Sequence, residues 1–414
     1  MFREAVMNCR ICDSAIENIQ WSMGKSAYGD AFKSSRSEAI SLSRQSLTLA
    51  TCDNCGFCQI LETPDENLLY REYTYQTKVT NNLDLFYENL VKNLLSAYFG
   101  QGYECDFVLD VGSGDGSFLK LFKEMGKRTL GIEPSMHLCR YSHESGIETI
   151  CEFFQRGISA SVIQNFGFPD LISANYVFAN SNQPLEFLQE VQKLMGPNTV
   201  LSILTGYHPD QFAVNMFDYV GHDHVSYFSL KDIENLSTRV GLKVIEAQRY
   251  EHKGGSLHLV LTLDSESSIY SASPNVYQLR QREIWTEQTK LTSILSLRNR
   301  VETERGKLAE YLKQNRISRL SGIGASTSTT YLINFLGIEN KLSELYDDDP
   351  QKIGKYSPGH GIPVIPLRSA LDSNSDALII LAWQHTNRII QRLTDLGFTG
   401  RVMTPLPTFK VIEI

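Results

Sequence analysis

Val108-Leu109-Asp110-Val111-Gly112-Ser113-Gly114-Asp115-Gly116 is the stretch that decides the fold of this chain. Its apolar start is typical of a buried parallel strand, and a glycine-rich turn follows before a helical pattern begins. Three glycines at alternate positions let the backbone take positive φ and approach a ligand closely. Dinucleotide sites use a different spacing, G-x-G-x-x-G, to place a pyrophosphate at a helix N-terminus. The spacing here therefore favours a compact ligand without phosphate.

A second strand pattern, Leu130-Gly131-Ile132-Glu133-Pro134, ends in a carboxylate that is placed to accept both hydroxyls of a ribose. A glycine loop alone is weak evidence, because such loops are often plain strand-to-helix turns. The loop and the carboxylate together predict S-adenosylmethionine as cofactor. The expected cofactor-binding residues are Asp110, Gly112, Ser113, Gly114, Gly116, Glu133, Pro134 and Asn175.

Short apolar segments alternate with helix-length segments through the middle of the chain. Strands are expected at residues 107–111, 129–133, 171–175 and 199–204, after a helix at about 83–98. This alternation predicts a doubly wound parallel sheet. Ligands of such sheets lie beyond the carboxyl ends of the strands, where Gly112, Glu133 and Asn175 all fall. The expected fold class is α/β, with a Rossmann-like core of the class I S-adenosylmethionine-dependent methyltransferase type.

Composition limits the partners of the chain. The net charge is -8, charged residues make up 21% of the sequence, and no basic arm is present, so nucleic-acid binding is not expected. No apolar run reaches the ~18 residues of a membrane span, and the N-terminus lacks a signal-peptide core. We expect a cytoplasmic protein that acts on a small molecule, as a monomer or a weak homo-oligomer. Its eight cysteines should then be reduced thiols.

Four of those cysteines form two C-x2-C pairs near the N-terminus. Cys9, Cys12, Cys52 and Cys55 have the spacing of a closed tetrahedral zinc site, which stabilises a fold and performs no chemistry. Cys58 is an alternative ligand to Cys55. Gly56 favours Cys55, because a glycine directly after the cysteine suits the tight turn of the pair. The competing interpretation is four free buried cysteines.

The chain length of 414 residues predicts two or three domains. We expect a zinc-binding domain at residues 1–66 and the methyltransferase core at 67–265. A serine-rich linker and a long helix should occupy 266–316. Strand patterns at 320–324 and 377–383 predict a second, Rossmann-like lobe at 317–414, which would contact the substrate.

The order and spacing of these motifs resemble the sugar C-methyltransferases, which add a branch methyl at C3 of nucleotide-linked 4-keto deoxysugars. The resemblance covers nearly the whole chain. It rests on the cysteine pairs, both cofactor motifs and the segments 221–229, 253–258, 322–326 and 347–359. It implies that the substrate is a nucleotide-linked keto-sugar.

Methylation at carbon requires removal of a proton from that carbon, and an adjacent ketone makes the resulting anion tolerable. A base with a pKa near neutral is needed, and histidine is the usual choice. By the resemblance His224 is this base. Asp223 and His222 flank it, and Tyr73 and Tyr75 match a family Tyr-x-Tyr that supplies an active-site phenol. A satisfied core histidine and two core-capping tyrosines are the alternatives.

The sequence departs from the family pattern in motifs that are expected to face the substrate. Gly221 replaces a tyrosine, Asp223 a glutamate, Ser328 a lysine, His258 an arginine, Asn180 a histidine and Lys253 a histidine. For Lys253 the alternative is a local shift, through which His252 would supply the imidazole. The cofactor motifs are intact. This asymmetry predicts an acceptor that differs in sugar, nucleotide or reacting atom. An O- or N-methyltransferase and a non-catalytic scaffold that binds S-adenosylmethionine or a sugar are the alternatives to a C-methyltransferase.

Overall fold

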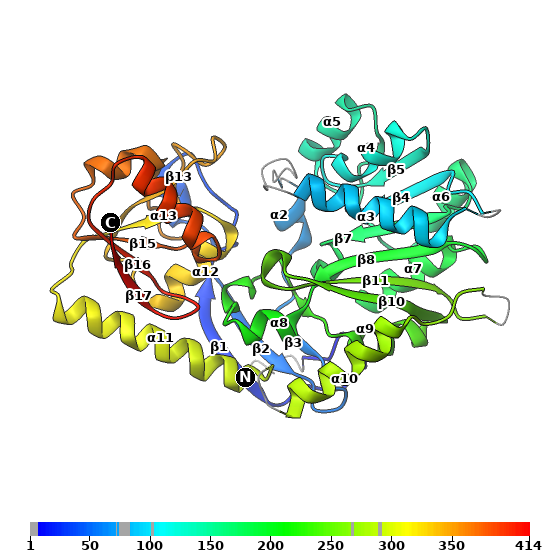
Figure 1. The fold of residues 1–414 in the computed structure, drawn as a ribbon, viewed down its shortest axis with the longest axis horizontal. Coiled ribbons are helices and arrows are strands. Elements are labelled where there is room, and N and C mark those ends of the chain that lie inside the picture. The colour runs from blue at the N-terminus through cyan, green and yellow to red at the C-terminus, as the bar shows by residue number, and fades with distance from the viewer. Residues whose placement is uncertain (1–6, 72, 74–82, 101–102, 266–268, 289–291) are drawn as a thin grey trace.

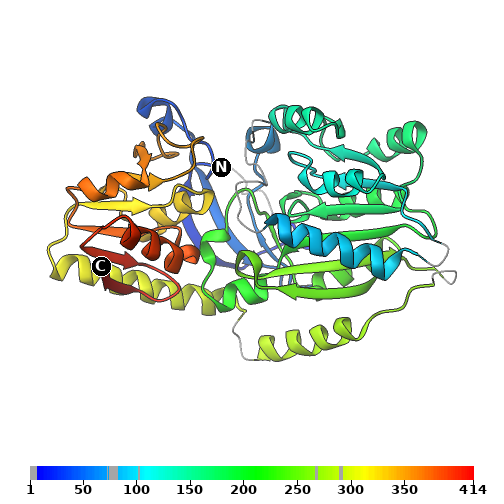
Figure 2. The same ribbon diagram turned by 45° about the horizontal axis from the view of Figure 1, so that its top comes forward.

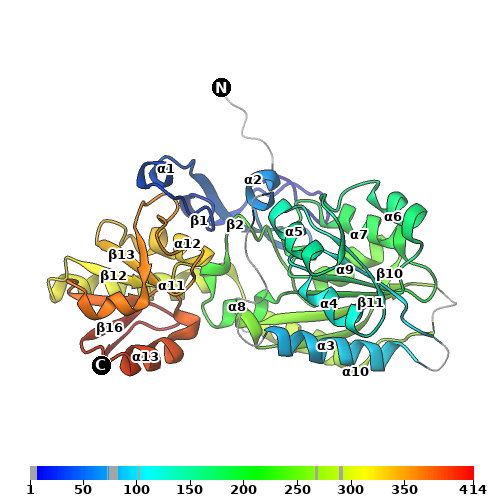
Figure 3. The same ribbon diagram turned by 90° about the horizontal axis from the view of Figure 1, so that it is seen from above.

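The computed structural model describes residues 7–71, 73, 83–100, 103–265, 269–288 and 292–414. Two lobes, each built on its own sheet, lie side by side (Figure 1). The strands of a smaller N-terminal sheet lie between the lobes, as the views in Figure 2 and Figure 3 show. Tyr75 falls outside the described residues, so its expected role stays a prediction.

The larger lobe contains the sheet that the glycine motif predicts. In spatial order its strands are β10 (Leu242–Tyr250), β11 (Ser256–Leu263), β8 (Val200–Gly206), β7 (Leu171–Asn175), β4 (Phe107–Val111), β5 (Arg128–Ile132) and β6 (Glu148–Ile150). β8, β7, β4, β5 and β6 pair in parallel, and β11 is antiparallel to both of its neighbours. Every residue of β4 is buried, as expected of a central strand with helices on both faces.

The helices of the larger lobe carry the chain between these strands. They are α3 (Leu83–Tyr98), α4 (Ser117–Glu124), α5 (Met136–Glu144), α6 (Ile158–Phe166), α7 (Pro184–Leu194), α8 (His208–Ala213) and α9 (Leu230–Arg239). Short 3-10 turns are η2 (Phe178–Asn180), η3 (Phe217–Tyr219) and η4 (His252–Gly254). The connections bring the ends of β4, β5 and β7 to one edge of the sheet.

The N-terminal sheet has both faces covered. It contains β1 (Ile19–Ser26), β2 (Gln45–Thr51), β3 (Cys58–Ile60) and β9 (Ser226–Tyr227), with α1 (Arg36–Ile40) and α2 (Glu66–Tyr70) beside it. Neighbouring residues of a strand point to opposite faces. In β2, Leu49 packs into the core shared with the C-terminal lobe, whereas Ala50 packs into the core of the larger lobe. The sheet therefore joins the two lobes.

The C-terminal lobe is a second doubly wound unit. Its sheet order is β14 (Val364–Pro366), β13 (Leu342–Asp347), β12 (Leu320–Ile323), β15 (Ala377–Ile380), β16 (Arg401–Thr404) and β17 (Lys410–Glu413). Its helices are α12 (Thr327–Leu336) and α13 (Thr386–Asp395), with 3-10 turns η5 (Leu367–Asp372) and η6 (Trp383–His385). The chain winds outward in both directions from β12 and β15. Ligands of such sheets bind at this switch point.

Two helices occupy the segment that the sequence predicts as one. α10 (Pro274–Gln288) packs against β10 of the larger lobe, and α11 (Ile294–Gln314) packs against β1 and β2. Ser293 begins α11 because its side chain accepts a hydrogen bond from the backbone N–H of Ser296. Among the described helices, none combines the length and apolar character needed to cross a membrane.

Cys139 and Cys151 are bonded as a disulfide, so the expectation of reduced thiols is wrong for this pair. Cys139 lies on helix α5 and Cys151 directly after β6, and their Cα atoms are 6.0 Å apart, which is within the range of a disulfide. The sequence gives no sign of this proximity, because the strand β6 that carries Cys151 to α5 is only three residues long and was not predicted.

Candidate active site

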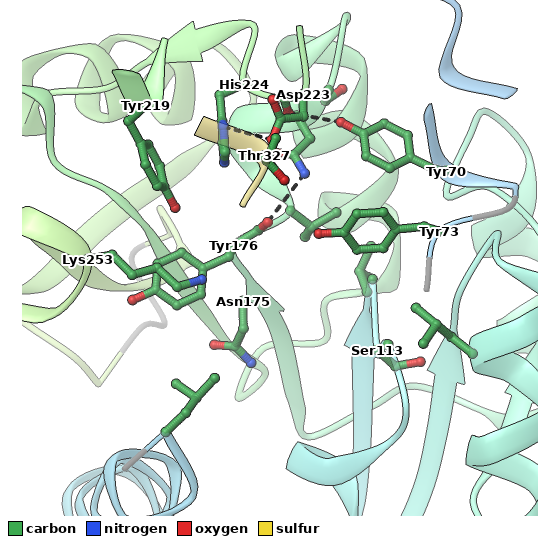
Figure 4. Close-up of a pocket in the computed structure, with 18 of the residues that line it drawn as sticks. Tyr70, Tyr73, Ser113, Asn175, Tyr176, Tyr219, Asp223, His224, Lys253 and Thr327 are labelled. Atoms are coloured by element: carbon green, nitrogen blue, oxygen red, sulfur yellow. Dashed lines mark hydrogen bonds and ion pairs between the residues drawn. The ribbon is translucent and has the colours of Figure 1, made fainter. Parts of the chain in front are cut away.

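A cavity of about 1000 Å³ opens at the carboxyl edge of the core sheet. Its walls include the turn after β4 with the ends of β5 and β7, the segment 216–224 before β9, the turn 251–254 and the first residues of the C-terminal lobe helices. Figure 4 shows His224, Tyr219 and Lys253 on one side of this space and Ser113 on the other. The predicted cofactor motifs and the predicted base therefore face one cavity.

The glycine turn has the conformation that its sequence predicts. Gly112 has φ +70° and Gly114 has φ +55°, and a Cβ at residue 112 would lie 2.7 Å from a methyl of Val177. Both glycines line the cavity. Gly116 does not. It precedes α4 with φ +77°, and a Cβ there would meet the Ser142 hydroxyl at 2.7 Å. Gly116 thus contributes to the shape of the turn on the side that packs against α5, away from the cavity.

Glu133 lies at the cavity wall with its carboxylate held by the backbone. The N–H groups of Gly114 and Ser135 each donate to it at 2.9 Å. Burial raises the pKa of Glu133, and these two N–H donors oppose that rise. Each carboxylate oxygen has one such donor, so each keeps a further lone pair for a ligand. Pro134, the next residue, also lines the cavity.

Asn175 at the end of β7 has a side-chain amide whose hydrogen-bonding capacity is unused within the protein. Both its Oδ1 and its Nδ2 are buried and have no hydrogen-bond partner in the protein. Leaving a buried amide unpaired costs about 1–3 kcal/mol, so such a group indicates a ligand that completes it. Ser113 Oγ is also buried without a partner, whereas Asp110 accepts a hydrogen bond from Ser173 at 2.6 Å. Burial raises the pKa of Asp110 to about 7.

Aromatic residues that the sequence analysis did not single out complete this side. Phe153 and Phe154 line the cavity after β6. The Phe154 ring packs 4.9 Å from that of Phe187, and the Arg71 guanidinium lies 4.8 Å from the centre of the Phe153 ring. Flat apolar surfaces of this kind suit a purine. Together with Asn175, the glycine turn and Glu133, they fit S-adenosylmethionine.

The predicted base lies opposite this wall. His224 Nδ1 is 3.3 Å from Asp223 Oδ2, and each of the two side chains is 20% exposed. The imidazole stacks on the Tyr219 ring with centroids 4.4 Å apart. Burial lowers the pKa of His224, the Asp223 carboxylate opposes this, and the Lys253 ammonium adds to it. The imidazole is therefore neutral at pH 7, with Nδ1 beside the Asp223 carboxylate and Nε2 left to accept a proton.

A phenol from the C-terminal lobe holds Asp223. The Tyr331 hydroxyl donates to Asp223 Oδ1 at 3.3 Å and accepts from the backbone N–H of His222 at 3.1 Å and of Gly29 at 3.3 Å. Gly221 lies directly against this ring, because a Cβ there would be 2.3 Å from Tyr331 Cε2. The tyrosine that the family pattern has at residue 221 would therefore not fit beside Tyr331.

The remaining predicted catalytic residues differ in their placement. His222 is fully buried outside the cavity, and its Nε2 lies 2.9 Å from the carbonyl oxygen of Ser46. Tyr73 lines the cavity, with its ring 6.2 Å from that of Tyr70. Tyr70 lines the cavity too and donates to the carbonyl oxygen of Asp223 at 2.9 Å. His222 thus positions the loop, whereas Tyr73 faces the ligand space.

A second polar cluster surrounds Lys253. Its ammonium lies 3.7 Å from the centre of the Tyr176 ring. The Tyr176 hydroxyl in turn lies 3.0 Å from His252 Nδ1 and 2.9 Å from Ser256 Oγ. Burial lowers the pKa of Lys253 to about 8. Tyr176, His252 and Lys253 all line the cavity.

Comparisons with known proteins agree with this geometry. Residues 83–247 match the family described as a methyltransferase domain, and residues 251–407 match the family described as a C-methyltransferase C-terminal domain. The C-methyltransferase NovU of Streptomyces niveus is 24% identical over 371 residues, which cover 89% of this chain and 87% of NovU. The chain is an S-adenosylmethionine-dependent methyltransferase of the C-methyltransferase family. The enzyme class and the family predicted from the sequence are confirmed.

Solved methyltransferases are similar to part of this C-methyltransferase. The plantazolicin methyltransferase BamL, in a complex with SAH, is 12% identical with a TM-score of 0.37, covering 45% of this chain and 87% of BamL. An S-adenosylmethionine-dependent methyltransferase from Clostridium acetobutylicum is 11% identical with a TM-score of 0.34, covering 45% of this chain and 97% of its own. Apart from these structures, the methyltransferase-domain match over residues 83–247 and the strand order of the core sheet confirm the class I methyltransferase fold predicted from the glycine motif.

The positions at which this C-methyltransferase departs from its family do not all face substrate. Asn180, Ser328 and Lys253 line the cavity. His258 does not, which corrects the expectation for that residue: it is 5% exposed within β11, with its Nε2 2.9 Å from Ser202 Oγ. Burial lowers the pKa of His258 to about 4, so it is a neutral core histidine.

The four N-terminal cysteines of the C-methyltransferase meet at one point. Their sulfurs all lie within 4.8 Å of one another, with Cys9 and Cys55 3.6 Å apart and Cys12 and Cys52 3.5 Å apart. Tetrahedral zinc with Zn–S bonds of ~2.3 Å needs sulfurs ~3.8 Å apart, so the cluster fits the ion. Cys58 is buried in β3, opposite Tyr227 of β9, and is not part of the cluster.

Proposed function

We propose that this C-methyltransferase methylates the carbon next to the ketone of a nucleotide-linked 4-keto deoxysugar, with His224 as the general base. The observation that carries the proposal is the pair of His224 and Asp223 in the same cavity as the cofactor motifs. Methylation of a hydroxyl or an amine needs no proton removed from carbon. A neutral imidazole beside a carboxylate supplies the base for that proton, and the similarity to NovU and to the C-methyltransferase C-terminal domain favours carbon over a hydroxyl, from which the same pair could also take a proton.

In the proposed reaction His224 Nε2 takes the proton from the sugar carbon, and the electron pair moves onto the ketone oxygen to give an enolate. Asp223 holds the imidazole in the tautomer that leaves Nε2 unprotonated, and it stabilises the imidazolium that forms. The lowered pKa of His224 keeps the base available at neutral pH. Tyr219 fixes the plane of the ring by stacking on it.

When bound, S-adenosylmethionine would supply an electrophilic methyl group, whose bond to sulfur breaks as its bond to the sugar carbon forms, with S-adenosylhomocysteine as the leaving product. The residues proposed to hold it are Asn175, Ser113, the turn of Gly112 and Gly114, and Glu133 at the ribose. Asp110 lies buried at the base of this wall. Their place at the carboxyl ends of β4, β5 and β7 supports this assignment.

The C-terminal lobe supports a nucleotide-linked substrate. Ser326, Thr327 and Ser328 at the start of α12, and Arg388 in the first turn of α13, line the cavity opposite the core sheet. Helix N-termini and an arginine favour phosphate oxygens. The two helices follow β12 and β15, at the switch point of the second sheet. We assign this wall to the diphosphate and the nucleoside.

The N-terminal cysteine cluster is proposed to bind structural zinc. Four sulfur ligands close the coordination sphere, so the ion would have no open position for substrate.

The test is the site of methylation. The enzyme is incubated with S-adenosylmethionine labelled with ¹³C at the methyl group and a panel of dTDP- and UDP-linked 4-keto-6-deoxyhexoses, and the product is analysed by mass spectrometry and ¹³C NMR. We expect a methyl resonance coupled to a sugar carbon. A methyl on oxygen or nitrogen would replace the proposal by the heteroatom alternative. Binding of donor and sugar with no transfer would favour the non-catalytic scaffold.

A further inference from the structure

Lys253 is a partly buried cation without an anion. Its ammonium rests on the face of the Tyr176 ring at 3.7 Å, and within the described residues it forms no ion pair with a carboxylate. Burial alone accounts for the lowering of its pKa to about 8. Keeping a charge away from water without a counter-charge is costly, so the site favours a ligand that brings negative charge to the ammonium.

The backbone at Lys253 has a strained, left-handed conformation, which directs the side chain onto the Tyr176 ring. Lys253 has φ +52° and ψ +38°, a conformation that residues with a Cβ rarely adopt. Tyr176, on which the ammonium rests, has φ +54°. Gln211 Nε2 donates to the carbonyl oxygen of Lys253 at 3.2 Å and holds the turn in place. Strain of this kind in two touching residues of one cavity points to a functional role.

The ammonium also lies near the base. Its charge adds to the lowering of the pKa of His224, and both side chains line the same cavity. Figure 4 shows Lys253 and His224 on the same side of the cavity, with Tyr219 between them and Asn175 below. The ketone oxygen is bonded to the carbonyl carbon, and the carbonyl carbon is the direct neighbour of the acidic carbon. A cation on this side of the cavity is therefore suited to that oxygen.

We propose that Lys253 is a catalytic residue that binds the enolate oxygen of the substrate as His224 removes the proton. The inference rests on the proposed function. The C–H bond breaks with its proton going to His224 Nε2, the electron pair forms a C–C double bond, and the carbonyl π electrons move to the oxygen beside Lys253. The ammonium donates a hydrogen bond and remains protonated throughout. The ligand class is an oxyanion formed during the reaction, which an ammonium in a site that excludes water binds strongly.

Two other roles for Lys253 make different predictions. As the proton acceptor itself, Lys253 would have to be neutral, and an arginine could not replace it because the guanidinium does not deprotonate. As a merely structural cation on Tyr176, it would change folding stability and leave the rates alone. The charged role requires only that residue 253 carry a positive charge within reach of the oxygen.

The pH dependence follows from the groups that face Lys253. The groups that interact with it are Tyr176 from the end of β7, His252 on its own turn and His224 from the loop before β9, while Glu251 and His385 of the C-terminal lobe line the same cavity. His224 must be neutral, so kcat/KM should fall as the pH drops below 6.5 through its lowered pKa. Lys253 must be charged, so kcat/KM should fall as the pH rises through about 8.

The experiment compares Lys253→Met and Lys253→Arg with the wild type in the full-length enzyme. With the 4-keto-6-deoxyhexose probes in D2O and S-adenosylhomocysteine in place of the donor, ¹H NMR follows loss of the acidic sugar hydrogen. We expect Lys253→Met to slow both this exchange and methyl transfer by ~10²-fold or more, the usual effect of removing one oxyanion donor. Lys253→Arg should retain a larger share of both rates and shift the alkaline limb of kcat/KM above pH 9.

Controls separate the possible failures. Lys243→Met removes a lysine at the far end of β10 that lies 4.0 Å from Asp264, and it should leave all rates unchanged. The melting temperature of Lys253→Met should equal or exceed that of the wild type, because an uncompensated charge is removed. Equal exchange rates in Lys253→Met and the wild type would overturn the role of Lys253 alone. Absence of exchange in the wild type with every probe would overturn the proposed function, and this inference with it.

Discussion

Asn175 is the residue that most directly connects protein stability with cofactor binding. Its amide is buried with neither polar atom paired, and it lies in the wall assigned to S-adenosylmethionine. Asn175→Leu keeps the approximate size and removes the unpaired groups. We expect the ligand-free variant to be at least as stable as the wild type in thermal unfolding. Its binding of S-adenosylmethionine, measured by calorimetry, should be weaker by about 1–3 kcal/mol in free energy, which appears as a higher dissociation constant.

Thr262→Val is the matched control for this change. Thr262 Oγ1 is also buried without a partner, but it lies in β11 outside the cavity. This variant should gain stability and keep its donor affinity. If Asn175→Leu bound S-adenosylmethionine as tightly as the wild type, the unpaired amide would have no part in cofactor binding.

His224 and Asp223 divide the work of proton removal. We expect His224→Ala to lose ~10²-fold or more in kcat, because it removes the proton acceptor, while calorimetry finds S-adenosylmethionine affinity nearly unchanged. Asp223→Asn should be milder, and the acid limb of its kcat/KM profile should move to lower pH, since the carboxylate raises the pKa of His224. Near-normal turnover of His224→Ala would eliminate the mechanism through carbon deprotonation.

At the scale of the element, helix α12 and the loop before β9 are coupled through Tyr331 and Gly221. Tyr331→Phe would leave the backbone N–H groups of Gly29 and His222 without their acceptor, and should lower the free energy of unfolding by about 1–3 kcal/mol. Gly221→Ala should destabilise more in the wild type than in a Tyr331→Leu background, because its Cβ would meet the tyrosine ring. Denaturant unfolding of the double-mutant cycle measures this coupling. Additive effects would show that the two residues do not oppose each other.

The sequence predicted the elements that have strong local patterns. β4, β7 and α3 have the bounds expected from their apolar periodicity. β6 and β9, with three and two residues, are too short to show a period. The pairing of β9 with β3 joins residues far apart in the sequence and depends on packing. The place of Asn175 in the cavity wall was predictable from its position at a strand end, whereas the direction of the Lys253 side chain depends on a left-handed backbone that its sequence does not favour.

At the scale of the whole molecule, the arrangement of the cavity walls depends on all three sheets. The N-terminal sheet packs its two faces against different lobes, and β3 pairs with β9 directly after the segment that carries His224. The ring of Phe57, beside the cysteine cluster, lies 5.4 Å from the ring of Phe228, which follows β9. A change at the N-terminal cysteines should therefore reach the catalytic loop through the backbone pairing of β3 with β9, and reach β4, β5 and β7 through the apolar core that these strands share with the cysteines.

Metal removal tests this coupling. We expect one zinc per chain by elemental analysis, and Cys12→Ser should lose the ion, because a closed four-sulfur site tolerates no missing ligand. The variant should melt ~5 °C or more below the wild type. Its methyl transfer rate should also fall further than its S-adenosylmethionine affinity, since β3 is hydrogen-bonded to β9 next to the His224 segment, whereas the cofactor wall meets the N-terminal sheet through apolar packing. Cys58→Ser is the control: this cysteine is buried in β3 outside the cluster, so the variant should keep its zinc. A protein that lacks zinc when purified, or that loses it in Cys58→Ser but not in Cys55→Ser, would contradict the assignment.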